Sequence, residues 1–168
     1  MMRKIAFKPI VTKDSHVLIL GTMPSEESLR KKERYGHKSN QFWRIMFAIF
    51  DEPFPDNYAE KEALLSQNNI AIWDVLESCE GLGSLDSGIR NEKPNNFKNF
   101  YKEYPQIKHI FFTSKKAEQF YKKYVGFDDS RIFITLPSPS PANAQMKLEE
   151  KIAKWRILFE VVKSYSEP

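Results

Sequence analysis

The chain is poor in the residues that bind metals. It has a single cysteine, Cys79, among its 168 residues. One cysteine cannot form an intramolecular disulfide, and it excludes a four-cysteine iron–sulfur or zinc site. The three histidines, His16, His37 and His109, lie far apart and show no metal-ligand spacing. We therefore expect a protein without a metal or any other cofactor.

Long apolar segments are missing as well. No apolar run approaches the roughly 20 residues needed to cross a bilayer, and the N-terminus lacks an apolar stretch with a small-residue cleavage site. Hydrophobic residues make up 41% of the chain and charged residues 29%, which is typical of a soluble globular protein. The sequence predicts one domain over residues 1–168, in a monomeric, cytoplasmic protein that does not bind membranes.

Glycine-rich phosphate loops are also absent. The segment GTMPSEESL (21–29) contains neither G-x-G-x-x-G nor G-K-[ST], which disfavours a nucleotide-metabolising α/β enzyme. The net charge of +4 permits binding to a polyanion but is weak evidence by itself.

Four short apolar runs alternate with helical patterns. The runs HVLILG, IAIWDV, HIFFT and RIFITL are typical of buried strands at 16–21, 70–75, 109–113 and 131–136. Amphipathic patterns predict helices at 40–50, 58–69, within 94–104, 114–124 and near 145–164. This alternation predicts a three-layer α/β/α domain with a central four-stranded, mainly parallel sheet and right-handed crossovers.

Ligands of open parallel sheets bind beyond the carboxyl ends of the strands. This rule selects four loops as candidate binding segments: GTMPSEES (21–28), VLESCEGLGSLDS (75–87), TSKK (113–116) and PSPSPANA (137–144). The polar stretch 80–96 is the longest segment without a regular pattern, and it is as consistent with a simple connector as with a functional loop.

Each of these segments also has a structural explanation. Ser25 and Asn40 are suited to capping helices, and Phe42 and Trp43 are ordinary core residues. The segment LPSPSPANA (136–144) is consistent with a stiff connector whose Ser or Asn caps the last helix, or with a rigid loop that meets a phosphate.

The motifs are more informative together. GTMPS, HKSNQFW, WDVLESCEGLGSLDSGI and PSPSPAN occur in this order and follow predicted strands or precede helices. In this combination the chain resembles the uracil-DNA glycosylase superfamily over about residues 16–160, and within it the hypoxanthine-DNA glycosylase branch. The resemblance implies an enzyme that flips a deaminated base out of DNA, hypoxanthine first and uracil second, and hydrolyses its N-glycosidic bond.

The resemblance also implies catalytic roles. Mismatch-specific relatives carry an Asn in the first motif, where this chain has Met23, which cannot hold a water by a strong hydrogen bond. In the hypoxanthine branch the water-orienting role passes to the Asn of the second motif, here Asn40. Ser138 stands where classical uracil enzymes carry a His that stabilises the leaving base. A hydroxyl donates a weaker hydrogen bond, which suggests a slower or more permissive enzyme.

The remaining site residues follow from the same resemblance. Ser140 is the candidate for gripping the target phosphate, Pro141 stiffens the loop, and Asn143 either binds DNA or caps the last helix. Thr113 replaces an amide that reads the base in relatives, so base specificity is open. No lysine occupies an implied catalytic position, which predicts a monofunctional enzyme. The other candidate substrate-binding residues are Gly21, Thr22, Pro24, Tyr35, His37, Phe42, Asp74, Ser84 and Asp86.

Two alternatives remain open at this point. The missing amides at Met23 and Thr113 are consistent with a non-catalytic nucleic-acid-binding module of the same fold. A uracil- or mismatch-specific glycosylase is the other.

Overall fold

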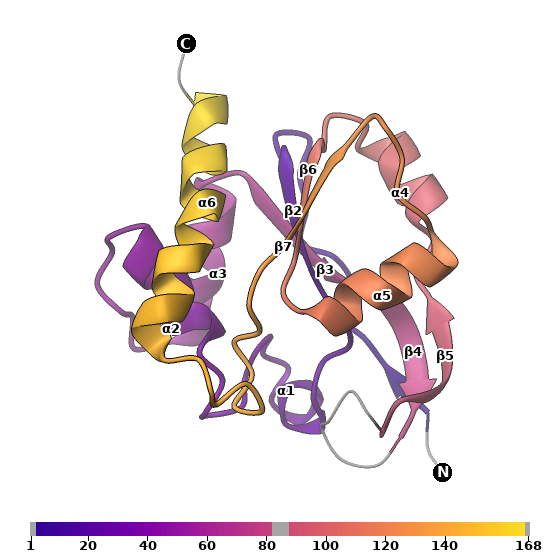
Figure 1. The fold of residues 1–168 in the computed structure, drawn as a ribbon, viewed down its shortest axis with the longest axis horizontal. Helices are drawn as coiled ribbons and strands as arrows, with labels where there is room; N and C mark the ends of the chain where they lie inside the picture. Colours follow the sequence, from indigo (N-terminus) through magenta and orange to yellow (C-terminus); the bar gives the residue numbers. More distant parts are fainter. Residues whose placement is uncertain (1–2, 82–87, 167–168) are drawn as a thin grey trace.

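The computed structural model describes residues 3–81 and 88–166. At its centre lies a four-stranded parallel sheet made of β2 (Val17–Gly21), β3 (Ile70–Asp74), β6 (His109–Phe112) and β7 (Ile132–Thr135). The strand order is β3-β2-β6-β7 (Figure 1). The register pairs Leu20 with both Trp73 and Phe112, so the carboxyl ends of these strands lie side by side.

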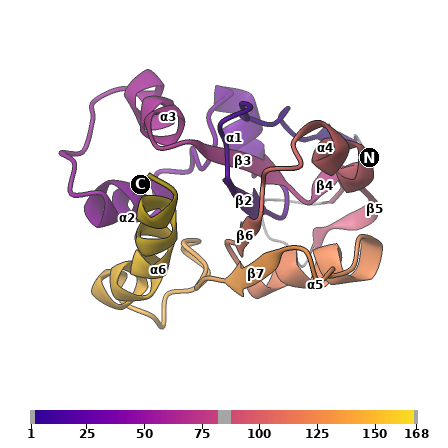
Figure 2. The same cartoon turned by 90° about the horizontal axis from the view of Figure 1, so that it is seen from above.

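Helices cover both faces of this sheet. One face packs against α2 (Phe42–Ile49), α3 (Tyr58–Gln67) and α6 (Leu148–Ser166). The other packs against α4 (Phe97–Glu103) and α5 (Lys115–Tyr124). The two views show these helices on opposite sides of the strands (Figures 1 and 2). The predicted three-layer α/β/α architecture is confirmed.

The central strand β2 is apolar along its whole length because both of its faces are buried. Val17 and Ile19 contribute to the core beneath α2, α3 and α6, whereas Leu18 and Leu20 contribute to the core on the opposite face. All four side chains are at most 1% exposed. A strand buried on both sides reads as a continuous hydrophobic run, and this is what made HVLILG recognisable in the sequence.

A second, smaller sheet corrects the prediction for the segments that follow β3. The segments Leu76–Glu80 and Arg90–Pro94 were expected to be loop, but they form the strands β4 and β5. These two strands pair with each other in antiparallel fashion, and β4 also pairs with β1 (Lys4–Ile5). Antiparallel strands with one solvated face carry polar residues, so LESCE and RNEKP look like loop in the sequence. Arg3 Nε donates a hydrogen bond of 2.9 Å to Ser78 Oγ across this sheet.

The first helix begins as the sequence predicts. Ser25 is the N-cap of α1 (Glu26–Lys31), and its hydroxyl accepts a hydrogen bond from the backbone N–H of Ser28. Across the part of the chain that the structure describes, no helix combines the length and apolar character of a membrane span.

Ile19→Ala tests the central position of β2. The substitution removes side-chain volume from a site with no exposure, so we expect the free energy of unfolding to fall by about 2–5 kcal/mol. Urea denaturation followed by circular dichroism measures it. The control is Ile157→Ala in α6, whose side chain is 43% exposed and which should cost far less. Equal losses for the two variants would contradict the assignment of β2 as the centre of the core.

Candidate active site

The carboxyl edge of the parallel sheet opens into a pocket of about 620 Å³. This volume lies in the range of small-molecule and cofactor sites. The pocket brings together four segments that are far apart in the sequence. Thirteen of the residues selected from the sequence line it: Gly21, Thr22, Met23, Pro24, Tyr35, His37, Asn40, Asp74, Thr113, Ser138, Ser140, Pro141 and Asn143.

Gly21 allows the walls of the pocket to approach one another. A Cβ added at this position would lie 2.8 Å from Tyr35 Oη and 2.9 Å from Asp74 Oδ1. Both distances are shorter than normal van der Waals contact, so any larger residue displaces a pocket side chain. The glycine at the end of β2 is therefore required by close packing of polar groups rather than by backbone conformation.

Asn40 lines the pocket immediately before α2. The helix N-cap is Gln41, so the predicted capping position of Asn40 is wrong by one residue. The Asn40 side chain still contacts the helix start, because its Oδ1 accepts a hydrogen bond of 2.9 Å from the Phe42 backbone N–H. This bond fixes which end of the carboxamide is oxygen, and it leaves the NH₂ group with two donors.

The loop between β7 and α6 is stiffened by its own serines. Ser138 Oγ accepts from the Ser140 N–H at 3.1 Å, and Ser140 Oγ accepts from the Ala142 N–H at 3.2 Å. Each hydroxyl that accepts a backbone N–H keeps its own proton available for donation. Both serines line the pocket, so both can donate a hydrogen bond to a bound molecule.

Asn143 holds the same loop together. Its Nδ2 donates a hydrogen bond of 3.1 Å to the Ser138 carbonyl, and its backbone N–H donates to the Ser140 carbonyl at 3.0 Å. Helix α6 starts only at Leu148, so Asn143 does not cap it. Of the two roles that the sequence left open for Asn143, helix capping is wrong; contact with DNA stays a prediction.

Two hydrogen bonds attach this loop to α2 and α6, and a third joins α6 to the start of α2. The Gln41 backbone N–H donates to the Pro139 carbonyl at 2.9 Å, and Trp155 Nε1 donates to the Pro137 carbonyl at 2.8 Å. Lys151 Nζ donates to Gln41 Oε1 at 2.7 Å. Lys151 is buried, and burial lowers the pKa of its ammonium group. The loop and the start of α2 are thus held as one unit.

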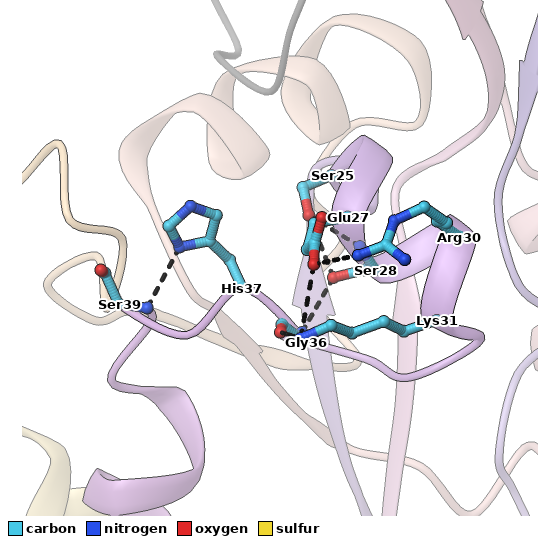
Figure 3. A network of polar contacts seen from close by, with 8 residues as sticks. All are labelled: Ser25, Glu27, Ser28, Arg30, Lys31, Gly36, His37 and Ser39. Atoms are coloured by element: carbon cyan, nitrogen blue, oxygen red, sulfur yellow. Dashed lines mark hydrogen bonds and ion pairs between the residues drawn. The ribbon is translucent and has the colours of Figure 1, made fainter.

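Tyr35 reaches the pocket from a loop that is attached to α1. Its ring stacks on buried Phe42, with 3.9 Å between ring centroids and an interplanar angle of 11°. Phe42 therefore supports a pocket residue without lining the pocket. The next residue, Gly36, donates its N–H to Ser28 Oγ and accepts a hydrogen bond from Lys31 Nζ (Figure 3).

His37 follows Gly36 in the chain but forms its hydrogen bond with a different segment. Its ring is turned away from α1, and its Nδ1 accepts a hydrogen bond of 3.1 Å from the Ser39 N–H (Figure 3). This bond requires Nδ1 to be unprotonated, so the neutral ring carries its proton on Nε2.

The sequence did not point to Arg34. Its guanidinium is buried, lines the pocket, and lies with Nη1 3.7 Å from Asp74 Oδ2. Arg34 Nη2 also donates to the Lys8 carbonyl, and the guanidinium carbon lies 5.3 Å from the centre of the Phe7 ring. Six other residues between 26 and 34 are charged, so nothing in the local sequence distinguishes Arg34 as buried.

Two predicted residues cannot be placed. Ser84 and Asp86 lie outside the described residues. Within residues 3–81 and 88–166, no group of three or more His, Cys, Asp or Glu side chains is arranged to hold a metal ion.

The chain is similar to known proteins over nearly its whole length. The family model of the Uracil DNA glycosylase superfamily matches residues 9–160. A hypoxanthine DNA glycosylase from Methanosarcina acetivorans is 32% identical over 161 residues, covering 94% of this chain and 99% of the relative. One from Methanosarcina barkeri is 33% identical over 120 residues, covering 71% of this chain and 76% of the relative.

A solved structure is also similar to this chain. A solution NMR structure of a candidate uracil DNA glycosylase from Methanosarcina acetivorans superposes with a TM-score of 0.82 at 31% identity. The match covers 96% of this chain and 99% of that one. The chain belongs to the uracil DNA glycosylase superfamily, as the motifs in its sequence suggested. Its named sequence relatives are hypoxanthine DNA glycosylases.

Gly21→Ala tests the close packing of the pocket. The added methyl group lies within 3 Å of the Tyr35 hydroxyl and the Asp74 carboxylate, so one of them must move. We expect base release from DNA, measured under single-turnover conditions, to slow by roughly 100-fold, the scale of a 1 Å misplacement in an active site. Ala153→Ser is the control, because it adds one heavy atom at an exposed position of α6. Unchanged activity in Gly21→Ala would show that the pocket tolerates the shift.

Proposed function

We propose that the protein is a DNA repair glycosylase that flips a deaminated base into the pocket and hydrolyses its N-glycosidic bond. Hypoxanthine is the preferred base, because both named relatives are hypoxanthine DNA glycosylases; uracil is the second substrate. The observation that carries the proposal is that Asn40 and Ser138 line one pocket, each with its side-chain oxygen held by a backbone N–H. The expected single-domain, monomeric and cytoplasmic protein stays a prediction.

In this proposal Asn40 orients the attacking water. The Phe42 N–H occupies one lone pair of Oδ1, which leaves the second lone pair and the NH₂ group for the water. A carboxamide is not basic enough to deprotonate water at neutral pH. Its contribution is therefore position and electrostatic stabilisation of the cationic sugar through the partial negative charge of Oδ1.

Ser138 acts on the leaving base. As the glycosidic bond breaks, the base gains negative charge, and the Ser138 hydroxyl can donate a hydrogen bond to it because its oxygen already accepts from Ser140. A neutral hydroxyl stabilises the anion less than a charged group does. This suits a substrate such as hypoxanthine, whose anion is delocalised over two rings.

The rest of the loop holds the DNA backbone. Ser140 is placed to donate to the phosphate of the flipped nucleotide, and Pro139 and Pro141 reduce the entropy lost when the loop binds. None of the described residues that line the pocket is a lysine, which supports hydrolysis without a Schiff-base intermediate. The polar side chains among the described lining residues are hydroxyl, amide, imidazole and ionic groups, which can take these roles without a metal ion.

Strand cleavage at a hypoxanthine tests the proposal. A duplex with one hypoxanthine, treated with the protein and then with alkali, should break at that position, and Asn40→Ala should slow base release by about 100-fold or more while duplex affinity stays within a few-fold. Asn57→Ala is the matched control, because Asn57 caps α3 away from the pocket. Binding without a strand break by the wild-type protein would favour the non-catalytic DNA-binding module.

Ser138→Ala separates the leaving-group role from DNA binding. The loss of one hydrogen bond to the departing base should slow hypoxanthine release by about 10-fold, with little change in the dissociation constant of the duplex. Ser140→Ala should do the reverse and weaken binding more than the chemical step. Single-turnover rates and fluorescence anisotropy on the same oligonucleotide measure the two effects, and the reverse pattern would exchange the two assigned roles.

A further inference from the structure

We propose that Arg34 and Asp74 together read the lactam edge that deamination creates on a base. This inference rests on the proposed base-excision function and specifies how the same pocket recognises its substrates. It concerns a buried ion pair in the pocket wall. Asp74 belongs to the central motif and is a candidate substrate-binding residue without an assigned contact, whereas Arg34 lies in none of the motifs.

The two side chains come from different parts of the fold and meet at the pocket. Asp74 ends β3, whereas Arg34 lies in the loop after α1. Their side chains are only 9% and 6% exposed, and both line the pocket. Arg34 therefore presents a cationic donor next to an anionic acceptor, in surroundings where neither charge is well solvated.

The spacing of the pair leaves it able to bind a third group. Arg34 Nη1 and Asp74 Oδ2 are 3.7 Å apart, which is longer than a normal charge-assisted hydrogen bond of about 2.7–2.9 Å. Arg34 is held from the other side by the Lys8 carbonyl and by the ring of Phe7. These contacts orient the guanidinium without using the Nη1 hydrogens.

Gly21 allows the carboxylate to lie at the pocket edge of the sheet. Asp74 Oδ1 is 2.9 Å from the position that a Cβ of residue 21 would occupy, so a larger residue there would displace this oxygen. Ion pairs that serve only stability are often replaced by apolar residues without loss. A charged pair in the wall of a pocket is better explained by a polar ligand.

Deaminated bases have the complementary edge. Hypoxanthine carries an N1–H donor beside the O6 acceptor, and uracil carries N3–H beside O4. The N–H can donate to Asp74 while the carbonyl accepts from Arg34 Nη1. Adenine and cytosine present a ring nitrogen acceptor beside an amino group, so both contacts would oppose like groups. Deamination thus turns an edge that the pair rejects into one that it binds.

The same chemistry defines what the pair does not do. Guanine and thymine also have a lactam edge, so Arg34 and Asp74 do not exclude them. Their exclusion requires contacts with the guanine amino group and the thymine methyl group, or depends on their stable pairing in the duplex. The pair accordingly selects a class, the lactam bases, within which hypoxanthine and uracil are the damaged members.

The experiment compares hypoxanthine with 1-methylhypoxanthine at one position of the same oligonucleotide. Methylation at N1 removes the N–H donor. The wild-type protein should release hypoxanthine about 10- to 100-fold faster under single-turnover conditions, the range expected for one hydrogen bond to a charged group. In the double variant Arg34→Met/Asp74→Leu, which replaces the ions by apolar groups of similar size, this ratio should approach one. Arg156→Met, at an exposed position of α6, is the control and should keep the wild-type ratio.

The outcomes separate the recognition from the reaction. A folded double variant with the wild-type ratio would overturn the inference, and so would a wild-type protein that releases both bases equally. If circular dichroism shows that the double variant is unfolded, the single variant Asp74→Ala takes its place. A ratio near one in Asp74→Ala supports the inference, and the wild-type ratio overturns it. If the wild-type protein releases neither base, the proposed enzyme function fails. Anisotropy then decides the inference: tighter binding of the hypoxanthine oligonucleotide supports it, and equal binding overturns it.

Discussion

The hydrogen bond from the Gln41 N–H to the Pro139 carbonyl joins the two segments on which the site depends. Asn40 and Ser138 each lie one residue from this bond, on segments almost a hundred residues apart. Lys151 and Trp155 of α6 hold the same two segments from behind. The long C-terminal helix thus has two functions: it covers one face of the sheet, and it fixes the relative position of the proposed water-orienting amide and leaving-group donor.

The parallel sheet brings the residues at its strand ends close to Asn40 and Ser138. Because its four strands end at the same edge, Gly21, Asp74 and Thr113 face the loop that follows β7 across one pocket. Only neutral donors come from Asn40 and Ser138, whereas the charged groups, Arg34 and Asp74, stand together in the wall. In our account the neutral groups act on the reacting bond and the charged pair identifies the base, which explains how a site without a catalytic His can still be selective.

The sequence predicted those parts of the structure that leave local signals. Strands buried on both faces are continuous apolar runs, so the central sheet and its helices were recognisable, and the rule for carboxyl ends located the pocket. The strands β4 and β5 were missed because their stability comes from partners distant in the chain and their residues are polar. Arg34 was missed for a related reason: its burial depends on Lys8, Phe7 and Asp74, none of which is its neighbour in sequence. The hydrogen bonds of Asn143 within its own loop could not be predicted from the sequence. An Asn shortly before a helix is equally consistent with a helix cap and with a residue that stabilises the loop.

The central claim is that one pocket at the carboxyl edge receives a flipped-out deaminated base. It is tested most directly by NMR of the ¹⁵N-labelled protein with a duplex containing a non-hydrolysable 2′-fluoro analogue of deoxyinosine. We predict that the backbone amides of Asn40, Asp74 and Ser140 shift together and saturate at one duplex concentration, and that the same duplex with adenine leaves Asp74 unshifted. Equal shifts of Asp74 with both duplexes, or shifts confined to surfaces away from these three residues, would contradict the account.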